Sequence, residues 1–285
     1  MLLQDIHIRD PFVLVDGGKY YMYGTRGVSC WGKASGFDVY VSEDLATWDG
    51  PTECFSTPEG FWSDMNYWAP EVHAYQGKYY MFASFKSPER CRATQILVAD
   101  VPTGPFRVHS EPITPADWEC LDGTLYVEDG TPYMVFCHEW VQVGDGEVCA
   151  VRMSEDLKKA VSEPMLLFKA SDLPDVEEVG EPGRYGYVTD GPFMYRTEAG
   201  SLLMIWSSFT KEGYCEAVAR SESGTVAGPW KQEKMLYTKD GGHGMFFRRM
   251  SDNTLCFVCH KPNKTPDERP VFAEVAEEND TLTAR

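Results

Sequence analysis

The stretch GYVTDGPFMYR, residues 186–196, places Asp190 directly before Gly191-Pro192 and a run of strand-forming residues. Similar openings occur at Asp10 in HIRDPFVLV, residues 7–15, and at Asp122 in ECLDGTLYV, residues 119–127. In each case an acid stands at the entrance of an apolar or aromatic segment. Three acids that introduce three such segments indicate one structural position that the chain uses repeatedly.

Aligning the chain on its turn residues reveals five related units. They are DPFVLVDGGKYYMYGT (10–25), APEVHAYQGKYYMFAS (69–84), DGTLYVEDGTPYMVFC (122–137), DGPFMYRTEAGSLLMIWSS (190–208) and HGMFFRRMSDNTLCFVCH (243–260). Each unit has the pattern of a β-hairpin, with a Gly or Asn turn between two apolar strands. A third strand-like segment follows each hairpin, and the unit starts are 59, 53, 68 and 53 residues apart. This spacing leaves room for a sheet of four strands in every unit.

Five four-stranded units predict an all-β fold, a five-bladed β-propeller that forms a single domain over residues 1–285. The innermost strand of each blade lines the central channel of a propeller. Equivalent residues at the starts of these strands therefore gather at one end of the channel. The alignment puts five residues in this ring: Asp10, Ala69, Asp122, Asp190 and His243. An aspartate before Gly or Pro is also common turn chemistry, but three in one register favour a shared site.

Composition narrows the choice of ligand and compartment. The net charge of −18 disfavours nucleic acid and anionic membranes as partners and favours a neutral oligosaccharide or polysaccharide. No apolar run is long enough to span a membrane, and the N-terminal MLLQDIHIRD lacks the features of a signal peptide, so a cytoplasmic location is expected. The nine cysteines have no framework spacing, which predicts free and mostly buried thiols. Cys256 and Cys259 should point to opposite faces of one strand rather than chelate a metal.

Grouped carboxylates suit the hydrolysis of glycosidic bonds. Repulsion keeps one carboxyl group protonated while another stays ionised. In inverting glycoside hydrolysis, an ionised carboxylate activates water and a protonated partner, roughly 6.5–9.5 Å away, donates to the leaving oxygen. Calcium binding is an alternative use of the same acids, but it leaves the nearby aromatic residues Trp68, Trp140 and Trp206 unexplained. We predict that these three rings bind substrate, although each ring is also a candidate core residue.

The segments RDPFVLVDGGKYYMYGT, YWAPEVHAYQGKYYMFAS, LDGTLYVEDGTPYMVF and TDGPFMYR resemble glycoside hydrolase family 43, and the resemblance covers nearly all of the chain. It implies a five-bladed propeller of inverting enzymes that act mainly on arabinose- and xylose-containing polysaccharides. Asp10 matches the family's general base, and Asp122 matches the aspartate that tunes and orients the acid. His243 matches a histidine that in several members holds a calcium ion or water in the channel. No cofactor is required for this chemistry, and calcium in the channel is the one metal expected.

The fourth blade departs from the family, which usually has Glu-Gly-Pro with the glutamate as general acid. Asp190 occupies that position here, and its side chain is one methylene shorter. Glu139, between His138 and Trp140, is a candidate substitute for the acid, and Glu71 is another. Each glutamate is expected to be a substrate-binding or structural acid rather than the proton donor. The catalytic set predicted from sequence is therefore Asp10, Asp122 and Asp190.

Two other functions share this fold. A carbohydrate-binding propeller without catalysis is one, and the aspartate in place of glutamate is its only support. A retaining hydrolase of the fructan-cleaving type is the other, with Asp10 as nucleophile and carboxyl groups about 5–5.5 Å apart. The polar stretch 169–187 is predicted to close one end of the cleft, which favours exo attack. Arabinofuranosyl, xylosyl and galactofuranosyl linkages all remain open as substrates.

Overall fold

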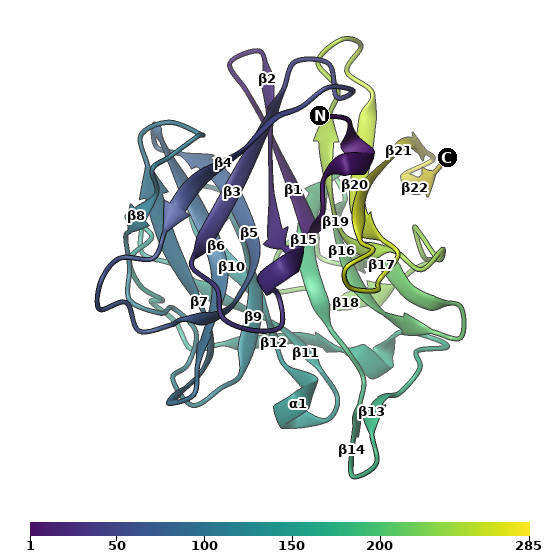
Figure 1. Ribbon diagram of the computed structural model, residues 1–285. Coiled ribbons are helices and arrows are strands. Elements are labelled where there is room, and N and C mark those ends of the chain that lie inside the picture. The colour runs from purple at the N-terminus through teal and green to yellow at the C-terminus, as the bar shows by residue number, and fades with distance from the viewer.

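The computed structural model describes residues 1–285 and consists of five antiparallel sheets of four strands each, arranged around one axis (Figure 1). Blade 1 comprises β1 (Ile8–Asp16), β2 (Lys19–Arg26), β3 (Gly36–Ser42) and β4 (Asp49–Ser56), and blade 2 comprises β5 (Met65–Tyr75), β6 (Lys78–Ser87), β7 (Arg90–Ala99) and β8 (Arg107–Val108). Blade 3 comprises β9 (Cys120–Glu128), β10 (Thr131–His138), β11 (Glu147–Arg152) and β12 (Met165–Lys169). Blade 4 comprises β15 (Asp190–Arg196), β16 (Leu202–Thr210), β17 (Gly213–Ser221) and β18 (Trp230–Gln232), and blade 5 comprises β19 (Gly242–Arg248), β20 (Leu255–Lys261), β21 (Arg269–Glu278) and β22 (Thr281–Ala284). The predicted five-bladed propeller is confirmed.

The connection from blade 3 to blade 4 carries an additional hairpin, β13 (Val179–Glu181) and β14 (Arg184–Gly186). It lies beside the short helix α1 (Trp140–Val143) at the lower edge of Figure 1. Three single turns of 3₁₀ helix complete the structure: η1 (Leu3–Asp5), η2 (Gly27–Ser29) and η3 (Ala170–Asp172). None of the helices has the length and apolar character needed to cross a membrane.

The ring of blades closes without a shared strand, because every sheet is built from four consecutive strands. Side chains join the first and last blades instead. Arg9 of β1 donates to Glu268 (2.5 Å) and to Asn263 (2.9 Å) in the loop between β20 and β21. Arg269 of β21 donates to the carbonyl oxygen of Gln4, at a distance of 3.0 Å. These contacts tie the N-terminal segment to blade 5.

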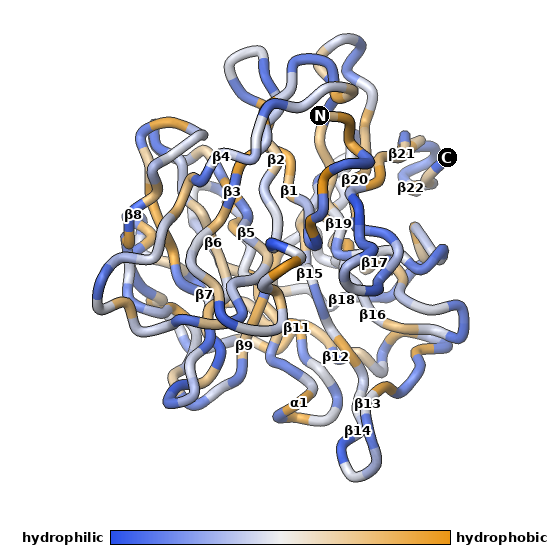
Figure 2. Tube along the Cα trace, in the orientation of Figure 1, coloured by the Kyte–Doolittle hydropathy of each residue, from blue (hydrophilic) through white to orange (hydrophobic).

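The core is divided into layers between neighbouring blades, and the hydrophobic stretches follow the strands (Figure 2). Alternate residues of a strand face opposite neighbours, so each blade contributes to two layers. Cys256 packs in the layer with blade 1 and Cys259 in the layer with blade 4, which confirms their opposite orientations. All nine cysteines are free thiols, and all are buried except Cys91, which is half-buried.

Trp206 belongs to one of these layers rather than to the substrate pocket. Its side chain is fully buried, packs against Phe168 at 5.2 Å and donates from Nε1 to Gln232 (3.0 Å). A ring enclosed in this way cannot stack on a sugar. The sequence-based assignment of Trp206 to substrate binding is therefore corrected, because the second strand of blade 4 turns this residue toward blade 3.

Every inner strand contains a bulge close to its start, at which two residues face one residue of the second strand. The first bulged residue has a left-handed backbone in all five blades: Asp10 (φ 52°), Ala69 (46°), Asp122 (57°), Gly191 (51°) and His243 (52°). This repeated irregularity defines the ring expected from the sequence. It also corrects one member of the ring, because the fourth position is occupied by Gly191 and not by Asp190.

The steric environment explains the glycine in the fourth blade. A Cβ atom at residue 191 would lie 2.6 Å from Cδ2 of His243, too close for any other side chain. Asp190 instead takes the preceding place on the strand, where it pairs with Ser207 as Arg9 pairs with Thr25 in blade 1. The acid of blade 4 is therefore displaced by one residue from those of blades 1 and 3.

The bulges release backbone N–H groups from the strand ladder, and the neighbouring blade captures them. The N–H groups of Ala69, Asp122, His243 and Asp10 bond to Thr25 Oγ1 (2.8 Å), Ser84 Oγ (2.9 Å), Ser207 Oγ (2.6 Å) and His260 Nδ1 (3.2 Å), in that order. The accepting residue always stands opposite the start of the bulge, on the second strand of the preceding blade. Cys137 holds this place in blade 3, and there the carboxylate of Asp122 accepts the N–H of Gly191 instead (3.0 Å).

These interblade hydrogen bonds should contribute measurably to stability. Ser84→Ala leaves the buried N–H of Asp122 without its partner, so we expect the free energy of unfolding to fall by about 1–3 kcal/mol. Urea denaturation followed by tryptophan fluorescence measures this change. Ser56→Ala, at an exposed position of β4, is the control and should change the same quantity by less than about 0.5 kcal/mol. Equal effects of the two substitutions would contradict this role of Ser84.

Candidate active site

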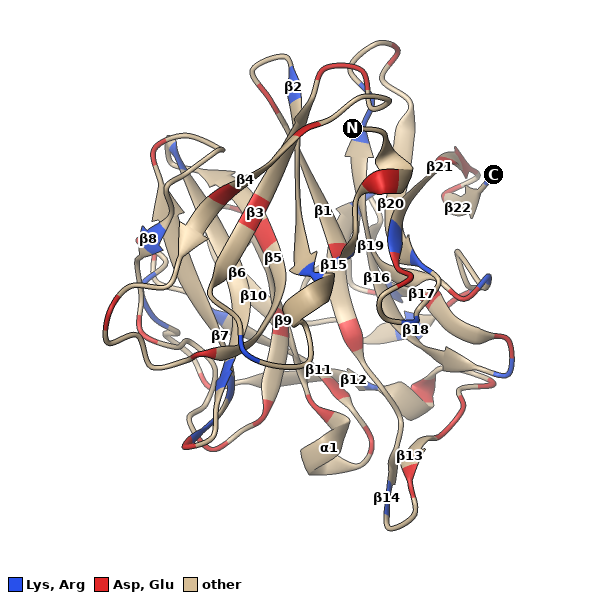
Figure 3. Cartoon of the chain, in the orientation of Figure 1, with Lys and Arg blue, Asp and Glu red and all other residues tan.

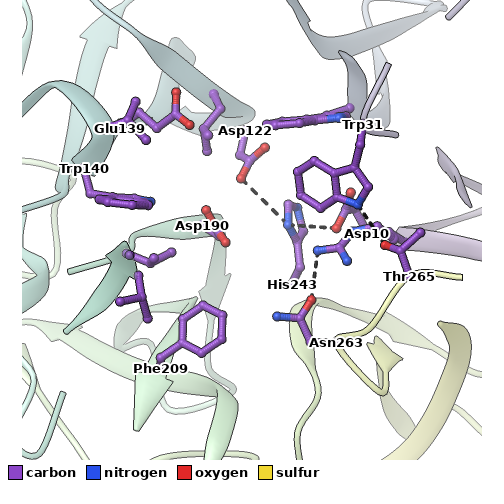
Figure 4. Close-up of a pocket in the computed structure, with 17 residues that line it drawn as sticks. Asp10, Trp31, Asp122, Glu139, Trp140, Asp190, Phe209, His243, Asn263 and Thr265 are labelled. Atoms are coloured by element: carbon purple, nitrogen blue, oxygen red, sulfur yellow. Dashed lines mark hydrogen bonds and ion pairs between the residues drawn. The ribbon is translucent and has the colours of Figure 1, made fainter. Parts of the chain in front are cut away.

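A cavity of about 860 Å³ opens at the end of the channel where the inner strands begin. All five blades contribute to its walls, and the hairpin β13–β14 adds Val179 and Gly180. Figure 4 shows the carboxyl groups of Asp10, Asp122 and Asp190 pointing toward the middle of this cavity. The structure thus brings the three acids predicted from the sequence together in one pocket.

Asp10 is held as a carboxylate by its neighbours. Thr25 donates to its Oδ2 (2.6 Å), and Nδ1 of His243 lies 3.3 Å from its Oδ1. Burial alone would raise the pKa of Asp10, but the nearby His243 and Arg9 hold this pKa below its ordinary value. His260 accepts the N–H of Asp10, and burial lowers its own pKa to about 4. Asp10 is therefore the most acidic of the three groups and is ionised at neutral pH.

Asp122 lies deepest of the three and has the opposite character. Its side chain is 4% exposed, and its Oδ2 accepts the N–H of Gly191 (3.0 Å). Burial and the negative charge of Asp10 raise the pKa of Asp122 well above its ordinary value. Because Gly191 follows Asp190 directly, this hydrogen bond fixes the backbone that carries the third acid.

Asp190 reaches the pocket from the start of β15, and Tyr214 donates to its Oδ2 (2.9 Å). Burial, followed by the charge of Asp122, raises the pKa of Asp190 to about 7, against opposing effects of His243 and Tyr214. A carboxyl group with this pKa stays largely protonated below about pH 7, where Asp10 is already ionised. Asp190 can therefore donate a proton while Asp10 accepts one.

His243 was expected to be the residue that holds calcium or water. Its Nδ1 faces two carboxylates, 3.3 Å from Asp10 and 3.8 Å from Asp122, and its other edge lies against Gly191. Calcium takes six to eight oxygen ligands, and no group of three or more His, Cys, Asp or Glu side chains is arranged to hold a metal ion. The imidazole contacts the carboxyl group of Asp10 directly, and calcium or water at His243 stays a prediction.

Glu139 and Trp68 are joined by an arginine that the sequence analysis did not single out. Arg92 lies with its guanidinium 3.6 Å from the centre of the Trp68 ring, and its Nε is 3.5 Å from Oε2 of Glu139. Burial raises the pKa of Glu139 while Arg92 opposes this shift. Both predicted residues line the pocket, but Arg92 covers one face of Trp68 and leaves only the remainder for a sugar.

Of the other two residues predicted to bind substrate, Trp140 lines the pocket and Glu71 does not. Trp140, on α1, lines the pocket as expected, and Arg184 of β14 donates to the carbonyl of Val141 (3.1 Å), which holds the hairpin against α1. Glu71 does not line the pocket. It is 6% exposed and paired with His73 at 3.1 Å, which does not fit its predicted contact with substrate.

Sequence reasoning missed several residues of the site. Trp31 lines the pocket with 62% of its surface exposed, and its Nε1 donates to Thr265 (2.9 Å). Its loop has no counterpart in the repeat, so no alignment of the five units could reveal it. Thr25 and His260, in contrast, are the last residues of their repeat units, and this shared ending was a usable signal.

A propeller with four carboxyl groups and aromatic walls around one sugar-sized cavity has the features of a carbohydrate-active enzyme. The model of glycosyl hydrolases family 43 matches residues 5–278, and the chain belongs to this family. A solved structure described as an endo-arabinase from Bacteroides thetaiotaomicron is 40% identical, with a TM-score of 0.91 over 98% of each chain.

Two other relatives are less similar in sequence. A xylosidase/arabinosidase 43A of Humicola insolens is 28% identical over 154 residues, 49% of this chain and 46% of that protein. A xylosidase/arabinosidase of Bacteroides ovatus is 24% identical over 216 residues, 70% of this chain and 60% of that protein. The chain thus matches only about half the length of these relatives.

The separated pKa values of Asp10 and Asp190 predict an asymmetric pH profile of kcat/KM. The base must be ionised, so kcat/KM should rise as pH increases through the lowered pKa of Asp10. The acid must be protonated, so kcat/KM should fall as pH increases through about 7, the pKa of Asp190. Initial rates at low substrate concentration across this range measure the profile. Activity that keeps rising above pH 8 would exclude Asp190 as the proton donor.

Proposed function

We propose that the protein hydrolyses arabinofuranosyl linkages of neutral arabinan-type polysaccharides or oligosaccharides with inversion, and xylosyl linkages as the second choice. The observation that carries the proposal is the division of protonation between Asp10 and Asp190 in one sugar-sized pocket. Similarity to proteins described as arabinases and xylosidase/arabinosidases supports these sugars. Galactofuranosyl linkages have no comparable support.

In the proposed reaction, Asp10 removes a proton from a water molecule that attacks the anomeric carbon. The bond between that carbon and the leaving oxygen breaks as Asp190 donates its proton to this oxygen. Asp10 ends protonated and Asp190 ionised, and the two exchange a proton with solvent before the next turnover. His243 contacts the carboxyl group of Asp10, and Asp122 accepts the N–H of Gly191 next to Asp190, so these two residues influence the charge and placement of the reacting groups.

The surface supports an uncharged substrate. Acidic residues are distributed over loops and strands throughout the chain (Figure 3), and the net charge is −18. The pocket itself contains four acidic residues and a single arginine, Arg9. An anionic polysaccharide would meet repulsion at this entrance, whereas exposed Trp31 offers an apolar face to a pentose.

Exo attack is the proposed mode. The hairpin β13–β14 and α1 form a wall beside Asp190, and the remaining blades surround the pocket on the other sides. Endo attack is the second candidate, since the structure that is 40% identical is described as an endo-arabinase. Early release of single sugars from linear arabinan would support the first mode. Early release of long oligosaccharides with a steep drop in viscosity would support the second.

Substitution of the two acids separates their roles. Asp10→Asn should lower kcat by about 10²–10⁴-fold on every substrate, because the attacking water loses its base. Asp190→Asn should lower kcat by a similar factor on alkyl glycosides, whose leaving groups are basic, and by less than about tenfold on a dinitrophenyl glycoside. Turnover of both glycosides, with retained sugar binding checked by calorimetry, measures these effects.

Glu139→Gln is the matched control. This glutamate lines the same wall and is also carboxylic, but it is tied to Arg92. Loss of its carboxylate should lower turnover of the alkyl and the dinitrophenyl glycoside by similar factors. If the dependence on the leaving group appeared in the Glu139 variant and not in the Asp190 variant, Glu139 would be the acid. If neither Asp10→Asn nor Asp190→Asn lowered turnover, other groups would be the base and the acid. If the unmodified protein bound sugars but cleaved no glycoside, a carbohydrate-binding role would replace the proposal.

A further inference from the structure

A buried tyrosine that does not itself line the pocket contacts one of the pocket acids, and the reaction described above does not use it. Tyr214 stands on β17 with 1% of its surface exposed, and its hydroxyl donates to Oδ2 of Asp190 (2.9 Å). Oδ2 therefore already has a partner inside the protein. The other oxygen, Oδ1, is the one left for the substrate.

Packing prevents Tyr214 from moving away. Its ring stacks on the imidazole of His260 (5.5 Å, 23° between planes) and packs against Phe209 (5.0 Å). A Cβ atom at Gly242 would lie 2.8 Å from its Cε1, so the backbone of β19 closes the third side. Burial and the charge of Asp190 raise the pKa of Tyr214 well above its ordinary value, and the hydroxyl keeps its proton.

We propose that Tyr214 is a positioning residue that holds Oδ2 of Asp190 and thereby makes Oδ1 the proton donor. This inference rests on the proposed role of Asp190 as general acid. It also accounts for an aspartate at this place. A short side chain has few ways to reach the glycosidic oxygen, and a fixed partner on its rear oxygen selects the one orientation that faces the sugar.

Tyr214 is also connected to the proposed base, Asp10, because its ring stacks on His260, which bonds the backbone of Asp10. His260 accepts the N–H of Asp10 at Nδ1, so its Nε2 carries the proton and donates to Asn263 (3.1 Å). The rings of Tyr214 and His260 thus form one buried layer with the acid at one end and the base at the other. A shift of either ring would change the relative placement of the two carboxyl groups.

Tyr214→Phe removes only the hydroxyl and tests the inference. Asp190 is also faced by Asp122 on β9, His243 on β19 and Asp10 on β1, and by Glu216 on β17 and Cys137 on β10, all unchanged in the variant. Loss of a hydrogen bond to the ionised form should move the alkaline limb of the kcat/KM profile upward by about one unit. On alkyl glycosides kcat should fall by about tenfold or more, and on a dinitrophenyl glycoside by much less.

Two comparisons separate positioning from a general loss of structure. Tyr237→Phe removes a hydroxyl from a half-buried tyrosine that does not line the pocket, and it should leave both the pH profile and the ratio of the two glycosides unchanged. In an Asp190→Asn background, Tyr214→Phe should have no further effect on the ratio of kcat for the dinitrophenyl glycoside to kcat for the alkyl glycoside. An unshifted alkaline limb together with an unchanged ratio would overturn the inference while leaving the proposed function intact. Absence of any leaving-group dependence in Asp190→Asn itself would overturn both.

Discussion

A left-handed residue at the first position of one β-bulge per blade is the constraint on which the rest of the structure depends. Such a backbone costs roughly 1–2 kcal/mol for a residue other than glycine, and this chain places Asp10, Ala69, Asp122 and His243 there. The bulge turns its N–H toward the preceding blade, where a hydroxyl or imidazole accepts it. The same irregularity directs the side chain of Asp10, Asp122 or His243 into the pocket. Joining of the blades and assembly of the site are therefore consequences of a single local geometry.

The one interruption of this pattern lies beside the proposed acid. Cys137 stands where the other blades have Thr, Ser or His, and a thiol is a weak acceptor. Gly191 donates its N–H to Asp122 instead, which draws a carboxyl group of blade 3 into contact with the strand that carries Asp190. Because the three acids lie close together, their pKa values differ: that of Asp10 is lowered, and those of Asp122 and Asp190 are raised. His243, Arg9 and Thr25 gather on the side of Asp10, and the other two acids have no comparable set of donors.

Much of the fold and of the site could be predicted because both repeat. Five hairpin units with turns at equivalent places indicated the blades, and Asp10 and Asp122 shared one register in them. The fourth register was wrong by one residue, because turn length alone cannot distinguish Asp190 from Gly191. The contact between Gly191 and His243 that decides the matter joins blades 4 and 5 and leaves no mark within a single unit.

Aromatic residues were predicted less well for a related reason. Trp206 and Trp140 look alike in sequence, yet one faces the neighbouring blade and the other lies on α1 at the rim. Arg92, which covers one face of Trp68, comes from a third strand with no acidic or aromatic motif of its own. Trp31 lies in a loop that no other blade repeats. A repeat in the sequence identifies the positions that all blades share. The roles of these four residues depend on features that differ from blade to blade.

The stereochemistry of the first product tests the central claim most directly. If Asp10 activates water while Asp190 protonates the leaving oxygen, the anomeric carbon is attacked once and its configuration inverts. Proton NMR spectra of an α-linked arabinofuranosyl substrate, recorded before the product mutarotates, should show the β-anomer accumulating first. Initial appearance of the α-anomer would mean two successive displacements, with Asp10 as a nucleophile, and would contradict this account of the site.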